Sequence, residues 1–119
     1  MHEPRSVGMV PLATLQPSAI AGVKIVGRPV LEVATGKRMH LVVLHLPEGF
    51  VHPMHMHPET ESMGYVVSGR LEMVVGGKKF TLGPGDVWYH PQRVEHTTTA
   101  LETTIAIEAH APLREDLLR

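Results

Sequence analysis

The sequence predicts an all-β domain, either a sandwich or a barrel, built from many short strands. Two observations carry this prediction. The apolar segments are short and rich in β-branched residues, and 11 glycines and 10 prolines punctuate the chain too often for long helices. A length of 119 residues leaves room for one hydrophobic core and no second one.

The strand candidates follow one another along the chain, separated by glycine and proline turns. Val23 to Val33 alternates loosely, and Met39 to Leu46 is a clean candidate that ends at Pro47-Glu48-Gly49. Gly69 predicts a tight turn, and Gly76-Gly77 predicts a hairpin. The remaining strand candidates are 63–68, 70–75, 78–82, 87–89, 94–100 and 103–109.

Composition and charge argue against several classes of protein. No run of 18 uncharged apolar residues occurs, so we expect no membrane span. A formal net charge of -1 provides no global basic field for nucleic acid, and we find no helix-turn-helix segment. The absence of cysteine excludes disulfides and thiolate chemistry. We expect a cytoplasmic protein, because Pro11 interrupts the mildly apolar run Val7 to Leu15 and Glu3 cancels Arg5.

Nine histidines are a high number for this length, and some of them have the spacing of metal ligands. His55 and His57 are two residues apart, so on an extended strand both side chains point to one face. Neutral imidazole is the commonest metal ligand in proteins. His96 follows a Pro-Gly-Asp turn and a short strand, and it would supply a third nitrogen from a neighbouring strand. We assign His2 and His110 to surface or hydrogen-bonded positions.

Two motifs in the sequence resemble those of the cupin family. Residues 49–57, a glycine followed by five residues and His-x-His, are similar to the start of the first cupin motif, and residues 65–69 are similar to its end. Residues 84–96 resemble the second motif, with its Pro-x-Gly-like turn and closing histidine. The resemblance covers about residues 30 to 116 and implies a double-stranded β-helix jelly-roll barrel.

This resemblance divides the chain into an N-terminal arm and a barrel. The arm comprises residues 1–29, and the barrel comprises residues 30–119 with a short C-terminal tail, in which 113–118 is the one candidate for a helical turn. We expect a homodimer, because the edges of a small barrel present unpaired backbone groups. The apolar segment 7–26 has no place in the barrel motifs, so we expect it to pair with or cover the partner's edge.

The resemblance also implies a divalent metal held by three histidines. These are His55, His57 and His96. We expect the metal to be Fe, Mn, Ni or Zn, and the sequence does not choose among them because imidazole ligands accept several divalent metals. The family usually places a Glu, or sometimes a Gln, seven residues before the glycine that ends the first motif, and here that position is Ser62. Two ligand sets stay open: three histidines with water, or three histidines with Glu61 turned inward by a bulge. Glu59 is a further candidate ligand, and a decayed site without metal is the remaining alternative.

Other polar residues are expected around this site. His90 is either an acid/base group facing the cavity or a buried histidine bonded to a backbone carbonyl. His52 is expected at the rim of the substrate pocket, and Ser62 and His45 are further pocket candidates. His40 and His45 have opposite strand parity, so one should face inward and the other outward.

These features favour a metal-dependent enzyme that acts on a small anionic organic substrate inside the barrel, by oxygenase, isomerase, lyase or decarboxylase chemistry. Three protein ligands leave positions on an octahedral ion for water or substrate. Serine in place of the usual carboxylate leaves the metal centre more positive by one charge, which favours an anionic chelating ligand. The alternative is a non-catalytic module that binds a small ligand or a metal, since the fold does not choose between the two.

Overall fold

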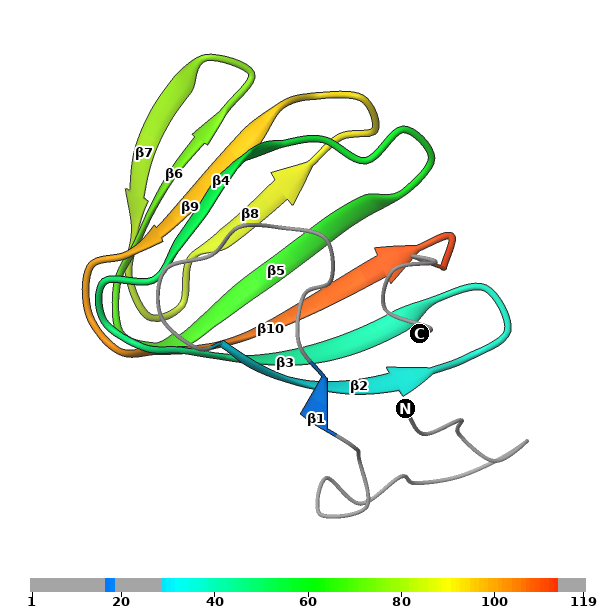
Figure 1. The fold of residues 1–119 in the computed structure, drawn as a ribbon, viewed down its shortest axis with the longest axis horizontal. Helices are drawn as coiled ribbons and strands as arrows, with labels where there is room; N and C mark the ends of the chain where they lie inside the picture. Colours follow the sequence, from blue (N-terminus) through cyan, green and yellow to red (C-terminus); the bar gives the residue numbers. More distant parts are fainter. Residues whose placement is uncertain (1–16, 19–28, 114–119) are drawn as a thin grey trace.

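The computed structural model describes residues 17–18 and 29–113, which form strands and turns without a helix (Figure 1). No helix in these ranges is long and apolar enough to cross a membrane. The strands are β1 (Pro17–Ser18), β2 (Val30–Thr35), β3 (His40–Leu46), β4 (Val51–His55), β5 (Glu61–Ser68), β6 (Leu71–Val75), β7 (Lys78–Leu82), β8 (Val87–His90), β9 (His96–Ala100) and β10 (Thr104–Ala111).

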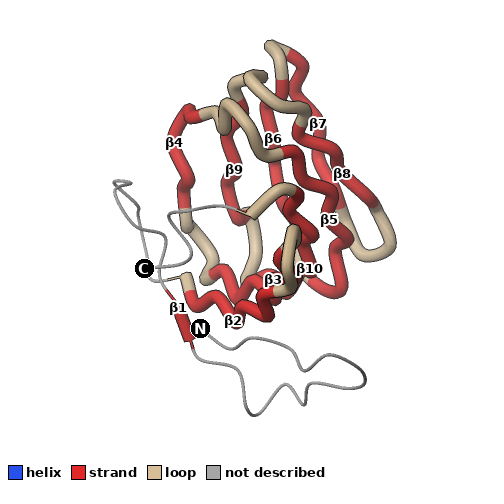
Figure 2. Tube along the Cα trace, turned by 90° about the vertical axis from the view of Figure 1, so that its right-hand side faces the viewer, coloured by secondary structure: helices blue, strands red, loops and turns tan. Residues whose placement is uncertain are grey.

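The strands form two antiparallel sheets that enclose a common interior. The six-stranded sheet has the order β1-β2-β3-β10-β5-β8, and the four-stranded sheet has the order β4-β9-β6-β7. Figure 2 shows β2, β3 and β10 on one side of the interior and β4 and β9 on the other. Strands distant in sequence lie side by side, as β3 and β10 do. The predicted all-β jelly-roll architecture is therefore confirmed.

Glycine turns connect the strands where the sequence predicts them. Gly76 and Gly77 join β6 to β7 with φ angles of 56° and 81°, the left-handed conformation that a two-residue hairpin turn requires. Gly69 has a φ of 93° and carries the chain from the six-stranded sheet to the four-stranded sheet. The predicted arm lies outside the described residues except for 17–18 and 29, and the predicted helical turn lies outside them except for residue 113.

The core fills the end of the barrel below the pocket and follows from strict alternation along the strands. In β3, β5 and β10 every second side chain is buried. The side chains that meet in the interior are mainly aliphatic and come from both sheets. They include Leu31, Val42, Leu44, Val66, Leu71 and Met73. Phe50, which is 1% exposed, closes this cluster at the start of β4. This packing supports both walls of the pocket.

Gly64 in β5 allows the indole of Trp88 to lie across the inner face of the sheet. The two residues are paired across β5 and β8. A β-carbon at position 64 would lie 1.9 Å from Cζ2 of Trp88, far inside van der Waals contact. The indole is 2% exposed, and its Nε1–H donates a hydrogen bond of 2.9 Å to Glu108 on β10. The missing side chain at 64 therefore sets the position of a buried hydrogen-bond donor.

We predict that Gly64→Ala destabilises the protein by about 3 kcal/mol, at the upper end of the range for over-packing, because the added methyl displaces Trp88. Urea denaturation measures the loss. Gly83→Ala is the matched control, since nothing lies within 4 Å of a β-carbon at position 83 and its φ is not in the left-handed region. Equal stability of the two variants would contradict this account of Gly64.

Candidate metal site and pocket

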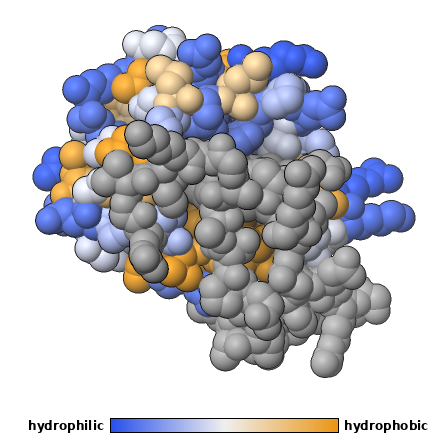
Figure 3. All heavy atoms as spheres, viewed as in Figure 1, coloured by the Kyte–Doolittle hydropathy of each residue, from blue (hydrophilic) through white to orange (hydrophobic). Residues whose placement is uncertain are grey.

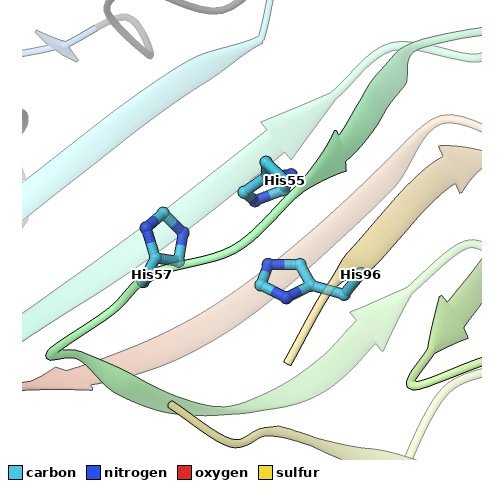
Figure 4. A group of neighbouring side chains, drawn as sticks. All are labelled: His55, His57 and His96. Carbon is cyan, nitrogen blue, oxygen red and sulfur yellow. The ribbon is translucent and has the colours of Figure 1, made fainter. Parts of the chain in front are cut away.

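Three histidines converge at one end of the four-stranded sheet. His55 is the last residue of β4 and His96 the first of β9, and the two are directly paired in the antiparallel register. His57 lies two residues beyond the end of β4. One ligand nitrogen from each ring lies within 4.8 Å of the others, and Figure 4 shows the three rings grouped between the strands. The structure therefore brings together the three metal ligands predicted from the sequence.

Backbone carbonyls hold two of these rings in the tautomer that suits a metal. His55 Nδ1 lies 2.7 Å from the carbonyl oxygen of Pro53, and His96 Nδ1 lies 3.1 Å from that of Val94. A carbonyl oxygen only accepts, so each Nδ1 must carry the proton and donate. Nε2 then carries the lone pair, which is the arrangement that ligating histidines use. The donor set therefore fits a divalent transition metal.

Two further histidines pack against this group. His90 stacks on His96 with ring centroids 3.8 Å apart, and His52 stacks on His55 at 3.6 Å. Burial lowers the pKa of His96 to about 3, with His90 and His55 adding to the effect. Burial also lowers the pKa of His90 to about 4, against the opposing influence of Glu108. Both rings are therefore neutral at pH 7, and His96 is ready to bind a metal without losing a proton.

The pocket beside these histidines opens at the same end of the barrel and holds about 570 Å³ of empty space, counted to its open mouth. Its floor is apolar and includes Leu31, Val42, Leu44, Phe50, Leu71 and Met73. The three candidate ligands form part of its lining together with other polar side chains. A small molecule in this pocket would contact both the apolar floor and the polar side chains.

A row of polar residues crosses the opposite wall, on the inner face of the six-stranded sheet. His110 is paired with Ser62, and Ser62 is paired with His90, so the three lie side by side on β10, β5 and β8. Each is buried and lines the pocket. Glu108 lies two residues before His110 on the same face of β10, and its carboxylate accepts a hydrogen bond of 2.6 Å from His110 Nε2.

Glu108 is a buried anion. Burial by itself would raise the pKa of its carboxyl group, but His110, together with His90 and Trp88, holds that pKa well below its usual value. His90 Nδ1 lies 3.9 Å from the same carboxylate. Sequence reasoning missed this group, because His110 was assigned to a surface or hydrogen-bonded position without a role in the pocket and Glu108 received no role. The signal was the Glu-x-His alternation of β10, which places both side chains on one face.

The structure separates the remaining predicted site residues into two sets. His52, Ser62 and His90 line the pocket, as expected. Glu61 and His45 do not. The Glu61 side chain is exposed on the outer face, where its carboxylate accepts a hydrogen bond of 3.2 Å from the Tyr89 hydroxyl. The register of β5 is regular around Glu61, so no bulge turns it inward.

His45 was predicted to line the pocket, and this prediction is wrong because His45 lies on the strand face opposite to the buried one. His45 lies on the outer face of β3 and pairs with Glu32. His40, its neighbour of opposite parity, is the inward-facing histidine and lies within hydrogen-bond distance of Thr35. Glu59 is exposed in the loop after β4 and does not belong to the histidine group.

Comparison with known proteins agrees with the fold. Residues 42–109 match the sequence model of the cupin domain, and the chain belongs to the cupin family. A stretch of 57 residues is 35% identical to the dimethylsulfoniopropionate lyase DddQ of Ruegeria pomeroyi, and it covers 47% of this chain. The match spans only 28% of the length of that relative.

Solved cupin-like structures superpose over most of the chain. KdgF from Halomonas sp. is 25% identical with a TM-score of 0.72, and the match covers 85% of this chain and 91% of KdgF. An RmlC-like cupin from Shewanella frigidimarina is 22% identical with a TM-score of 0.78, over 93% of this chain and 96% of that one. The protein is therefore a small single-domain cupin.

We predict that the metal-free protein loses stability as the pH falls below about 6.5, because unfolding exposes His90 and His96 to water. Above that pH both rings are neutral in the folded and unfolded states. Below it the unfolded chain takes up protons that the folded chain, with pKa values of about 4 and 3, does not. His90 alone should contribute a difference of about 2 kcal/mol between about pH 7 and about pH 5.

Urea denaturation in the presence of a chelator, at the two pH values, measures this difference. The His90→Gln variant, which cannot titrate at this position, should show a smaller pH dependence than the wild type. The same loss for wild type and His90→Gln would show that His90 does not resist protonation in the fold.

Proposed function

We propose that this cupin is a divalent-metal-dependent enzyme that acts on a small anionic organic substrate inside the barrel. The observation that carries the proposal is the convergence of His55, His57 and His96, two of them oriented by backbone carbonyls, at the mouth of a pocket with an apolar floor. A divalent metal bound there supplies Lewis acidity and coordination positions for an oxyanion. Fe, Mn, Ni and Zn all accept three imidazole ligands.

Other pocket side chains have separate roles in the proposed function. His90, neutral at pH 7, is the proposed acid/base group: its Nδ1 faces Glu108, so a proton taken up on Nε2 would leave a cation beside a carboxylate. His52 stacks on His55 and limits how that ring can turn. Ser62 adds a hydroxyl, and no charge, to the wall between His90 and His110. The apolar floor favours a ligand with a short carbon chain.

The relative named as a dimethylsulfoniopropionate lyase supports lyase chemistry on a small carboxylate as one form of this proposal. The second candidate function is a non-catalytic module that binds a metal or a small ligand, because the same pocket and histidines would serve it equally. Turnover distinguishes the two. A panel of small oxo-acids, hydroxy acids and catechols should yield a substrate with one of the four metals if the protein is an enzyme, and none if it is a binding module.

We predict that Ser62→Glu binds a divalent metal more tightly than the wild type, by at least roughly 10-fold, because it adds a carboxylate to the inner wall where the family usually has one. Glu61→Ala should leave the affinity unchanged, since Glu61 lies on the outer face. Binding of an anionic ligand to metal-loaded Ser62→Glu should weaken, because the new carboxylate cancels one positive charge. Isothermal titration with one metal measures these affinities.

The opposite pattern would refute the three-histidine site. If Glu61→Ala strips the metal while Ser62→Glu only lowers stability, then Glu61 is a ligand and reaches the metal by a local rearrangement of β5. Tyr89→Phe serves as the matched control for Glu61→Ala, because it removes the same hydrogen bond from the outer face without removing the carboxylate.

We also propose that the protein is a homodimer that associates through the outer face of the six-stranded sheet. Apolar side chains on β5, β8 and β10 are exposed and adjacent in the register: Tyr65 lies between Ile107 and Val87, and Met63 is paired with Tyr89. Figure 3 shows that hydrophobic residues also reach the surface among hydrophilic ones on the one side of the molecule that it draws. A contiguous exposed apolar face of this kind marks an interaction surface, and a two-fold dimer buries the same face on both copies.

The N-terminal arm, residues 1–29, was expected to contact the partner subunit, and most of it lies outside the described residues. Its described strand, β1, is paired with β2 of the same chain.

For the apolar face, we predict that the wild type sediments with twice the chain mass of 13.1 kDa and that Ile107→Glu sediments as one chain. Thr81→Glu, an exposed position on the other sheet, is the control. A wild-type mass of one chain at every protein concentration would contradict the dimer.

A further inference from the structure

The Glu108–His110 pair lines the pocket. In the proposed function Glu108 acts only through its charge beside His90, and His110 has no part in binding the metal or moving a proton. Both side chains are buried, with exposed fractions of 8% and 2%. The carboxylate is held from two sides, by His110 Nε2 at 2.6 Å and by Trp88 Nε1 at 2.9 Å. Burying an anion is unfavourable unless it is well hydrogen-bonded, so these contacts keep both Glu108 and His110 in one orientation.

This orientation leaves one nitrogen of His110 without a hydrogen-bond partner in the part of the chain that the structure describes. A carboxylate only accepts hydrogen bonds. Nε2 of His110 therefore carries a hydrogen atom and donates a hydrogen bond to Glu108. In the neutral ring Nδ1 is then a hydrogen-bond acceptor. It is buried, and it has no hydrogen-bond partner among the described residues. A buried polar atom in a native protein is rarely left unsatisfied, so a ligand in the pocket can supply the hydrogen-bond donor that the described residues do not.

The position of His110 defines which part of a ligand would meet it. His110 belongs to the six-stranded sheet, whereas the candidate metal ligands come from β4, the loop after it and β9 of the other sheet. Both groups line the same pocket. A ligand whose carboxylate lies at the metal site would therefore present its far end to the wall that holds His110.

We propose that His110, oriented by Glu108, accepts a hydrogen bond from a hydroxyl group of the ligand, and that the substrate is a short hydroxy acid with its hydroxyl remote from the carboxylate. This inference rests on the proposed metal-dependent function and narrows its substrate class. His110 acts here as a positioning residue. An alkyl group cannot donate a hydrogen bond to Nδ1 of His110. A ligand with a hydroxyl group at this point should therefore bind better than one with a methyl group of the same size.

The experiment compares acids that differ only in that group. The probes are 3-hydroxypropionate against butyrate, and 4-hydroxybutyrate against pentanoate, titrated calorimetrically into Zn²⁺-loaded protein at about pH 8, where all four acids are ionised. For the pair whose length matches the pocket, the hydroxy acid should bind roughly tenfold more tightly, the discrimination that one buried hydrogen bond provides. His110→Phe, which keeps a ring and removes the acceptor, should reduce the preference to about one.

A matched control exists on the same sheet. His45 and Glu32 form a His–Glu pair on the outer face, so His45→Phe makes the same substitution away from the pocket and should keep the full preference. A second measurement needs no variant. The ¹⁵N resonance of His110 Nδ1 in the wild type should shift when the hydroxy acid is added and stay in place when its methyl counterpart is added.

The outcomes separate this inference from the proposal on which it rests. If the protein takes up no Zn²⁺, the proposed function itself fails. If Zn²⁺ binds and each hydroxy acid binds no better than its methyl counterpart, with no shift at His110 Nδ1, the inference is overturned and the metal site stands. Zn²⁺ binding without binding of any of the four acids overturns the inference as well.

Discussion

The buried carboxylate of Glu108 is the group on which the arrangement of the inner wall depends. An anion in a barrel interior needs donors on several sides, and here His110 and Trp88 supply them. Trp88 reaches the carboxylate only because position 64 has no side chain. His90 lies beyond Glu108 on the next strand but one and stacks on His96. The wall is thus connected to the candidate metal ligands through the ring contact of His90 with His96.

This arrangement gives the pocket two chemically different sides. One side has the convergent imidazoles of His55, His57 and His96, which suit a divalent metal and thereby an anionic group. The other side has the imidazoles of His90 and His110 and the Ser62 hydroxyl, beside a Glu108 carboxylate that is already hydrogen-bonded. Family membership provides the barrel and the general position of the site, but the distribution of polar groups in this chain is what limits the ligand.

Much of the fold and part of the site could be predicted from the sequence, because both follow from the two-residue period of a strand and from glycine turns. That period placed His55 and His57 on one face and Ser62 on the inner face of β5, and glycine spacing located the turns at Gly69 and Gly76. The same rule left His40 and His45 undecided, since parity alone does not say which face is buried.

Other features depended on contacts that no local pattern contains. Whether Glu61 turned inward depended on a bulge, and β5 is regular there. Glu108 and His110 form a site only because β10 lies between β3 and β5, beside strands far away in the sequence. A glutamate in a strand near the end of the chain is ordinarily solvated, so its burial becomes visible only when the sheet order is known.

X-ray absorption at the zinc edge of the Zn²⁺-loaded protein is the most direct test of the central claim that the three histidines form a metal site. We expect a first shell of three imidazole nitrogens completed by solvent oxygen, unchanged in Glu61→Ala and with one imidazole fewer in His96→Ala. A wild-type spectrum with fewer than three imidazoles, or one that loses an oxygen ligand in Glu61→Ala, would contradict the account.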